Sequence, residues 1–250
     1  MRKIGVISDV HGNIAALKAI LSYFDETERC DEIIHTGDVV DIGPRSRECA
    51  ELLLSRRDVT LLLGNHDRDF VLDCAVMPKY SHVPALHKRQ VFDSLGEDLR
   101  KQIAQFPLFV HRKCGGSDVM FTHYAFKRGP DKLTGHLFHL LPSQLMEQYP
   151  DKTLPEIYDD VFSVEDFDAV FFGHEHRAGE YVGKRLYVDV GSVGCHPEPY
   201  AQGIVIDYDD KQWSYRRVSA PYDMSTTRNQ MKDVYDGEHL FRTYFMHGKK

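Results

Sequence analysis

The sequence predicts an α/β fold built on a layered parallel sheet, and three observations support it. Over residues 3–63, apolar runs alternate with helical patterns in the order strand, helix, strand, helix, strand. The runs themselves are nearly continuous, as expected for strands that are buried on both faces. Two alternating runs near the end of the chain, 203–208 and 212–218, predict a β-hairpin. We interpret this hairpin as part of a second, partly antiparallel sheet.

Each expected element follows from a local pattern. Asn13 suits the N-cap of a first helix, whose apolar residues recur at helical spacing. A second helix carries Cys49, Leu52 and Leu53 inward, and the glycine pair Gly115–Gly116 marks a hairpin turn. A polar surface helix is expected over 225–245. The expected strands before the final hairpin span residues 3–8, 32–37, 59–63, 108–112, 118–122, 169–173 and 185–190.

Two segments carry weaker patterns. Residues 69–106 are rich in charge, and we interpret them as helical, covering the sheet or forming a wall over the site. Residues 124–165 contain four prolines and no clean strand. They favour either a lid or specificity insertion, or a helical layer packed on the sheet. Residues 1–250 are expected to form a single domain that includes these two cap-like segments.

Bulk properties exclude several classes of protein. The hydrophobic content of 42% allows a sizeable core, and the net charge of −7 disfavours nucleic acid as the main ligand. No run approaches the roughly 20 apolar residues of a membrane helix, and the N-terminus leaves no room for a signal peptide. Five scattered cysteines favour reduced thiols and a cytoplasmic location. No pattern indicates an oligomeric state.

Five predicted strands are followed at once by residues that commonly bind metals. Open α/β sheets place their chemistry outside the carboxyl ends of the strands, so these side chains are expected to meet in one metal site. The candidate ligands are Asp9, His11, Asp38, Asn65, His123, His174 and His176.

This ligand set predicts a pair of ions. Imidazole and carboxylate ligands without a thiolate suit Mn, Fe, Zn, Co or Ni. Seven ligands are too many for one transition ion but fit two divalent ions that share a bridging carboxylate. Two cations about 3.5–4 Å apart lower the pKa of a bridging water and stabilise both oxygens of an in-line displacement. Phosphoryl centres suit this chemistry, and the adjacent His66 can supply the proton that a leaving oxygen needs.

The order of these motifs resembles the calcineurin-like metallophosphoesterase superfamily. The motifs are Asp9-x-His11, Gly37-Asp38, Gly64-Asn65-His66-Asp67, His123 and Gly173-His174-x-His176. Gly191-Ser192-Val193-Gly194 and Pro221-Tyr222-Asp223 resemble a bacterial and archaeal subgroup of predicted phosphodiesterases.

The resemblance implies a four-layer α-β-β-α sandwich of two mixed sheets, and manganese as the leading metal. One ion would take Asp9, His11, Asp38 and His176. The other would take Asp38, Asn65, His123 and His174. Asp38 would bridge the two ions, and His66 would act as general acid.

The run Gly37–Pro44 resembles a different branch, that of protein phosphatases and diadenosine tetraphosphatases. There the second Asp orients the catalytic His, which makes Asp41 a candidate partner of His66. That branch has a phosphate-binding Arg where this chain has Ile42. The candidate replacements are Arg45, Arg68 and Arg177, and His196 is a further candidate contact for substrate.

Several other residues receive structural interpretations. Asp67 is expected to support its loop, and Cys195 is expected to be a small packed thiol. The remaining histidines are interpreted as surface or internally satisfied residues; these are His35, His82, His87, His111, His136, His139, His239 and His247.

The leading hypothesis is therefore a hydrolase of phosphomonoesters or phosphodiesters, acting on a small phosphorylated substrate of which a nucleotide is one candidate. Its alternatives are a diadenosine tetraphosphate hydrolase and a protein phosphatase-like enzyme. A hypothesis of another class is a non-catalytic metal-binding scaffold, which the intact His66 disfavours. A nuclease is disfavoured because no basic cluster with interleaved aromatic residues is present.

Overall fold

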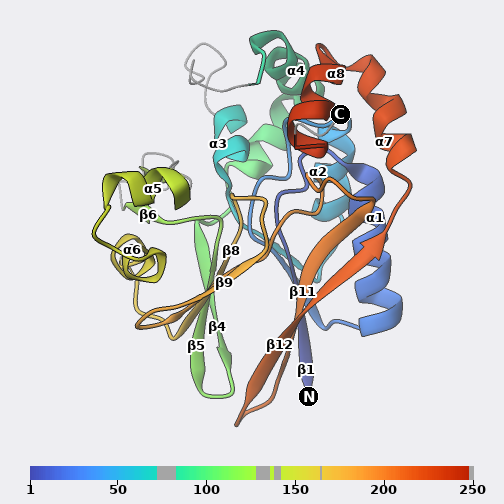
Figure 1. The fold of residues 1–250 in the computed structure, drawn as a ribbon. Helices are drawn as coiled ribbons and strands as arrows, with labels where there is room; N and C mark the ends of the chain where they lie inside the picture. Colours follow the sequence, from blue (N-terminus) through green and yellow to red (C-terminus); the bar gives the residue numbers. More distant parts are fainter. Residues whose placement is uncertain (72–82, 128–135, 138–141, 164, 248–250) are drawn as a thin grey trace.

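Two mixed sheets pack face to face, with helices on both outer sides (Figure 1). The computed structural model describes residues 1–71, 83–127, 136–137, 142–163 and 165–247. Each of the two sheets has five strands. The four-layer α-β-β-α fold predicted from the sequence is confirmed.

The first sheet combines a parallel centre with an antiparallel hairpin at one edge. Its strands are, in spatial order, β12 (Trp213–Pro221), β11 (Tyr200–Tyr208), β1 (Arg2–Ile7), β2 (Glu32–His35) and β3 (Val59–Leu61). The hairpin β11–β12 had been expected in the second sheet, and this assignment was wrong. It joins β1 because Ile204 and Ile206 continue the apolar face that Ile4 and Val6 begin.

The second sheet is also mixed. Its strands are, in spatial order, β4 (Phe109–Cys114), β5 (Ser117–Thr122), β8 (Ala169–Phe172), β10 (Leu186–Asp189) and β9 (Gly179–Val182). Strands β5, β8 and β10 are parallel, whereas β4 and β9 run antiparallel at the two edges. Both turn glycines between β4 and β5, Gly115 and Gly116, have positive φ, which confirms the predicted hairpin.

Three helices cover the outer face of the first sheet. They are α1 (Ile14–Ser22), α2 (Ser46–Leu54) and α4 (Ala85–Ile103). The side chain of Asn13 accepts a hydrogen bond from the backbone N–H of Ala16 at 3.2 Å, as the N-cap prediction requires. A π-helical segment, Tyr23–Glu28, continues α1, and α4 is kinked where Gly96 has a φ of 66°.

The outer face of the second sheet is covered by α6 (Leu154–Val161), next to α5 (Pro142–Gln148). Tyr158 and Phe162 pack against Phe172 of β8. For this part of segment 124–165, the helical layer is the correct alternative. A short pair of strands, β6 (Phe126–Lys127) and β7 (His136–Leu137), precedes α5. The prediction of a lid also covers 128–135 and 138–141, which lie outside the described residues. Residues 72–82 of the segment 69–106 lie outside them as well.

The core follows the two-residue period of the strands. On β2, Ile33 packs toward the helices and Ile34 toward the second sheet. On β8, Phe171 faces the first sheet and Phe172 faces α6. Three apolar layers therefore separate the four layers of secondary structure, and they hold the carboxyl ends of the two sheets against each other.

The C-terminal segment is not the polar surface helix that its sequence suggested. It is divided into α7 (Met224–Gln230), a 3₁₀ turn (Met231–Asp233), α8 (Gly237–Leu240) and a π-helical turn (Phe241–Phe245). Leu240, Phe241 and Phe245 are buried in a cluster that also includes Ile42 and Cys195. No helix in the described part of the chain is long and apolar enough to cross a bilayer.

Candidate metal centre

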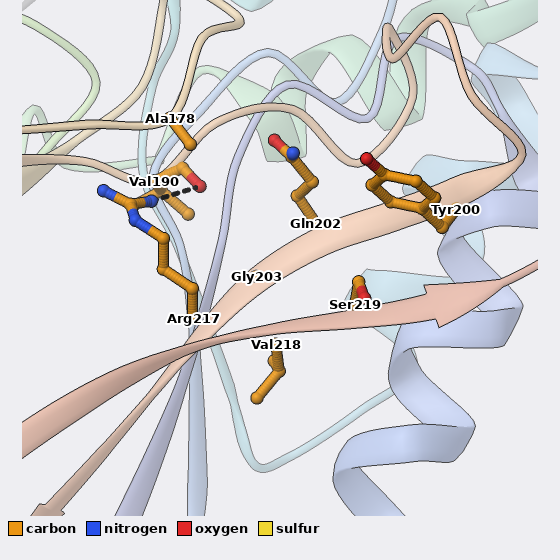
Figure 2. Close-up of a pocket in the computed structure, with 8 residues that line it drawn as sticks. All are labelled: Ala178, Val190, Tyr200, Gln202, Gly203, Arg217, Val218 and Ser219. Carbon is orange, nitrogen blue, oxygen red and sulfur yellow. Dashed lines mark hydrogen bonds between the residues drawn. The ribbon is translucent and has the colours of Figure 1, made fainter.

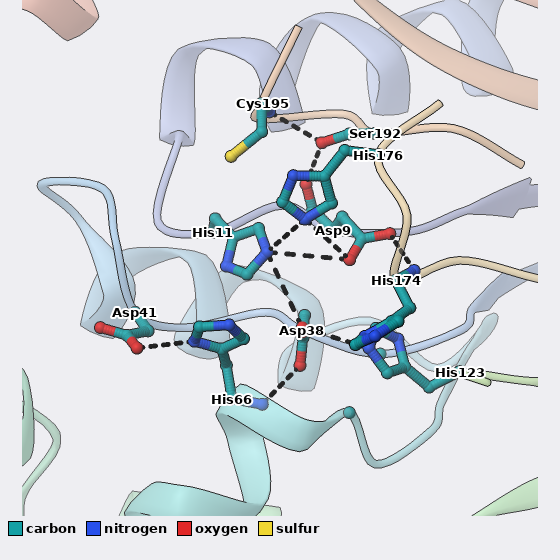
Figure 3. Close-up of polar contacts among 12 residues, drawn as sticks. Asp9, His11, Asp38, Asp41, His66, His123, His174, His176, Ser192 and Cys195 are labelled. Carbon is teal, nitrogen blue, oxygen red and sulfur yellow. Dashed lines mark hydrogen bonds and ion pairs between the residues drawn. The ribbon is translucent and has the colours of Figure 1, made fainter. Parts of the chain in front are cut away.

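The predicted ligands come together where the two sheets meet. From the first sheet, Asp9 and His11 follow β1, and Asp38 follows β2. Asn65 begins α3 (Asn65–Val71), which follows β3. From the second sheet, the ligands follow β5 and β8; they are His123, His174 and His176. Figure 3 shows six of these side chains converging from both sheets on one space; they are Asp9, His11, Asp38, His123, His174 and His176.

One group of donor atoms surrounds the Nε2 atom of His11. It lies 3.0 Å from Nε2 of His176 and 3.7 Å from Oδ1 of Asp9. Oδ1 of Asp9 is 3.4 Å from Nε2 of His176. Oδ2 of Asp38 is 3.8 Å from Nε2 of His11, which completes the set that the resemblance assigned to the first ion.

A second group shares Asp38 with the first. Its Oδ2 lies 3.2 Å from Nε2 of His123. Oδ1 of Asn65 lies 2.9 Å from Nε2 of His123 and 2.9 Å from Nδ1 of His174. Asp38 therefore stands between the two groups, where a bridging ligand belongs.

The donor set fits divalent cations. Oδ1 of Asp9 is buried and has no hydrogen-bond partner in the described structure. An unpaired carboxylate oxygen in the interior is costly, and a divalent cation would satisfy it. Burial alone would raise the pKa of Asp9, but His176, His11 and His123 outweigh it and hold the pKa well below its ordinary value. Asp9 is therefore a carboxylate, as metal binding requires.

The backbone is strained at the ligand positions. Five of the seven candidate ligands have left-handed backbone conformations, which are uncommon for residues other than glycine. Such strain persists where the surrounding fold enforces it and concentrates at functional sites. The φ values are 53° for Asp9, 45° for His11, 61° for Asp38, 80° for His174 and 59° for His176.

Asp67 fixes the loop that carries the shared ligand, as the sequence had suggested for it. Its Oδ2 accepts hydrogen bonds from the backbone N–H groups of Asp38 at 2.8 Å and Gly64 at 3.1 Å. Its Oδ1 accepts two more, from Val39 at 2.9 Å and Val40 at 3.2 Å. Four backbone donors thus converge on a side chain that is fully buried.

His66 lies beside the two groups of ligands. Its Nδ1 is 2.6 Å from Oδ2 of the buried Asp41, and its backbone N–H donates to Oδ1 of Asp38 at 2.8 Å. Its side chain is 20% exposed, so the ring borders the open side of the centre. Burial lowers the pKa of His66, but the charges of Asp38 and Asp41 outweigh it and raise the pKa to about 9.

The structure places a second histidine, His87, next to Asp41. Its Nε2 lies 3.2 Å from Oδ1 of Asp41, so Asp41 stands between two imidazole rings. Sequence reasoning took His87 for a surface or satisfied residue, because it lies in α4, far from any motif. The residue is buried. In the sequence, only its place among helically spaced residues that face the sheet indicated that His87 would be buried.

The candidate substrate residues lie in varied surroundings. Arg45 precedes α2 and forms an ion pair with Asp233 at 3.6 Å. Arg68 lies in α3, one turn beyond Asn65, and Arg177 follows His176 on the exposed surface. His196 packs its ring against Tyr200, with a centroid distance of 4.3 Å. Their contacts with substrate remain predictions.

A separate cavity of about 250 Å³ opens between β11, β12 and the end of β10. Figure 2 shows Arg217 and Gln202 on opposite sides of it. Arg217 donates to the backbone carbonyls of Asp189 at 2.9 Å and Gly179 at 2.6 Å, so its guanidinium serves mainly to join the two sheets. None of the seven candidate ligands lines this cavity.

Two facing mixed sheets with an Asp/His/Asn cluster at their common edge define an α-β-β-α protein with a candidate dinuclear metal centre. Comparison with known proteins agrees with this class. A sequence model of the calcineurin-like phosphoesterase family matches residues 2–178. The chain therefore belongs to the calcineurin-like phosphoesterase family.

Three relatives illustrate the similarity. An uncharacterized protein of Methanocaldococcus jannaschii is 27% identical, over 95% of this chain and 97% of its own. A metallophosphoesterase structure from Sphaerobacter thermophilus is 22% identical with a TM-score of 0.68, covering 95% of this chain and 96% of that one. A symmetrical bis(5'-nucleosyl)-tetraphosphatase of Coxiella burnetii is 35% identical, over only 33% of this chain and 28% of its own.

Proposed function

We propose that this protein is a dinuclear-metal-dependent hydrolase of phosphomonoesters or phosphodiesters. The observation that carries the proposal is the pair of donor groups that share Asp38. When bound, two divalent ions would neutralise phosphoryl charge and activate water for in-line attack. Asp9, His11, Asp38 and His176 would hold one ion. Asp38, Asn65, His123 and His174 would hold the other.

Within this proposal His66 acts as general acid. A ring nitrogen of His66 lies within 4.8 Å of candidate ligand atoms of His11 and Asp38, so the ring would lie beside the ions that these residues would hold. Oδ2 of Asp41 accepts a hydrogen bond from Nδ1–H of His66 and thereby fixes the orientation of the imidazole. Nε2 is then left to donate a proton to the leaving oxygen.

Manganese is our leading candidate for the metal, with iron, zinc, cobalt and nickel as alternatives, since imidazole and carboxylate ligands accept all of these ions. We also propose that residues 1–250 act as one domain and that the protein works in the cytoplasm. Its substrate would be a small phosphorylated molecule rather than nucleic acid.

A second candidate function is hydrolysis of a dinucleoside tetraphosphate. Two observations favour it: the Asp41–His66 pair and the partial similarity to tetraphosphatases, which reaches 37% identity over 102 residues for the Enterobacter enzyme. That similarity covers only 36% of the Enterobacter enzyme, so the substrate is not transferred with it. The other class of function, a metal-binding scaffold, predicts bound metals without turnover.

The test is hydrolysis by protein that has been stripped of metal and reloaded with Mn²⁺. The substrates are p-nitrophenyl phosphate, bis-p-nitrophenyl phosphate and diadenosine tetraphosphate, with His66→Ala as the control. Preference for either nitrophenyl ester supports the primary proposal and shows which bond is cleaved. Preference for the dinucleotide supports the second candidate. Two bound ions with no turnover of any substrate would favour the scaffold.

A further inference from the structure

The thiol of Cys195 lies at the edge of the first group of ligands. Single donor atoms of His11, His176 and Cys195 all lie within 4.8 Å of one another. Figure 3 shows the sulfur directed toward the two imidazole rings. Metal–sulfur bonds of about 2.3 Å and metal–nitrogen bonds of about 2.1 Å keep such ligands within roughly 4.4 Å of each other. The three donor atoms are therefore spaced almost as closely as ligands of a single ion.

A second observation points to an ion at the same place. Oδ1 of the fully buried Asp9 has no hydrogen-bond partner, yet it lies 3.4 Å from Nε2 of His176 and 3.7 Å from Nε2 of His11. Buried carboxylate oxygens are nearly always satisfied. The oxygen and the two Nε2 atoms thus gather around one space, and the thiol of Cys195 lies beside the same two histidines. A cation in that space satisfies the oxygen.

The loop that carries Cys195 is attached firmly to the loop that carries Asp9. Ser192 Oγ donates to the carbonyl oxygen of Asp9 at 2.7 Å and accepts from the backbone N–H of Cys195 at 2.7 Å. The backbone N–H of Gly194 donates to the same carbonyl at 2.9 Å. A Cβ on Gly194 would lie 2.0 Å from the carbonyl oxygen of Val10, so this close approach requires glycine. The backbone that carries the thiol is therefore held close to the loop of Asp9.

We propose that Cys195 supplies a thiolate ligand to the ion that Asp9, His11, Asp38 and His176 hold. The inference rests on the proposed metal centre and replaces the expectation of a packed, inert thiol. On binding, the thiol loses its proton to solvent and a sulfur–metal bond forms, with no change of oxidation state.

This ligand makes the two halves of the centre different. Soft thiolate favours zinc, cobalt or iron over manganese at the first position. The second position is served by Asp38, Asn65, His123 and His174, with no sulfur among them. The centre would therefore prefer a thiophilic ion at the first position and accept a harder ion at the second.

The test uses the full-length protein loaded with Co²⁺ and followed by absorption spectroscopy. Bands in the visible region report Co²⁺ bound by nitrogen and oxygen, and a near-ultraviolet charge-transfer band reports a thiolate ligand. We expect both in the unmodified protein. Cys195→Ser should keep the visible bands and lose the near-ultraviolet band. Cys30→Ser, at a half-buried cysteine outside the centre, should keep both.

A second readout is metal preference. Equilibrium dialysis with elemental analysis should show that Cys195→Ser weakens Zn²⁺ binding by about tenfold or more, while Mn²⁺ binding changes by less than about threefold. Circular dichroism of the variant verifies that it folds. Visible bands without a near-ultraviolet band in the unmodified protein would overturn the thiolate ligand and leave the metal centre standing. Absence of both would overturn the proposed centre itself.

Discussion

Nδ1 of His66 lies 2.6 Å from Oδ2 of Asp41, and Asp41 is completely buried. This contact orients the imidazole beside the candidate metal ligands. If His66 donates the proton to the leaving group, His66→Ala should lower kcat by about 10²–10⁴-fold. Asp41→Asn, which removes the charge but keeps the size, should lower kcat by about 10–100-fold. Steady-state kinetics with the preferred substrate measures both.

The matched control for these variants is Asp166→Asn, at a fully exposed side chain that forms an ion pair with Arg185. Metal content must be determined for every variant. Unchanged kcat in His66→Ala with two ions bound would rule out the role proposed for this residue.

His87 approaches Asp41 from α4, with Nε2 at 3.2 Å from Oδ1. We expect it to position Asp41 rather than to touch substrate. His87→Ala should therefore lower kcat by about tenfold with little change in KM, and its effect should not add to that of Asp41→Asn. A double-mutant cycle measures the coupling, with Arg89→Ala on the exposed side of α4 as control. Strictly additive effects would show that His87 does not act through Asp41.

Asp67 accepts four backbone hydrogen bonds around the loop of Asp38. Asp67→Ala leaves these buried donors without an acceptor, so we expect a loss of about 3 kcal/mol in the free energy of unfolding. Asp67→Asn keeps one acceptor oxygen and should lose less. Urea denaturation measures both, and a stable Asp67→Ala variant with unchanged metal affinity would contradict this role.

His35 makes stability depend on pH. Burial lowers the pKa of His35 from its ordinary value of 6.5 to about 4, and its Nδ1 accepts a hydrogen bond from the backbone N–H of Gly37 at 3.1 Å. The unfolded chain takes up this proton first, so the contribution of His35 is present above pH 6.5 and is lost as the pH falls toward 4. The full loss corresponds to about 3 kcal/mol.

The measurement is the free energy of unfolding between pH 7 and pH 4 for the unmodified protein and for His35→Gln. The variant should show a flatter dependence below pH 6.5, whereas His239→Gln on the surface should not differ from the unmodified protein. Identical curves for the unmodified protein and His35→Gln would contradict the prediction.

Local patterns were enough to predict which side chains meet at the candidate centre, because strand ends are marked by residues that are neighbours in sequence. Asp38 and His174 each follow an apolar run and a glycine, and the resemblance supplied their order. The pairing of strands that are distant in sequence was harder to predict. The hairpin of β11 and β12 alternates as any strand pair does, and nothing within it indicates that β1 is its partner. Strand β9 was missed because its four residues alternate at an exposed edge.

Other misses arose where tertiary packing decides the role of a residue. The C-terminal segment carries few apolar residues, and only the fold shows that Leu240 and Phe245 cover Ile42. His87 bears no local signature either, since its partner Asp41 lies far away in sequence. Isolated histidines are usually structural, so its contact with Asp41 becomes visible only in three dimensions.

The ligands of each proposed ion come from both sheets, with Asp9 and Asn65 on one side and His123 and His176 on the other. A bound pair of ions would therefore cross-link the two halves of the sandwich, much as disulfides join layers in other proteins. Chelation should then loosen β5 and β8 as well as the centre, with faster amide hydrogen exchange at both. By the same geometry, a partner that moves one sheet away from the other would separate the ligands and disrupt the centre without contacting it.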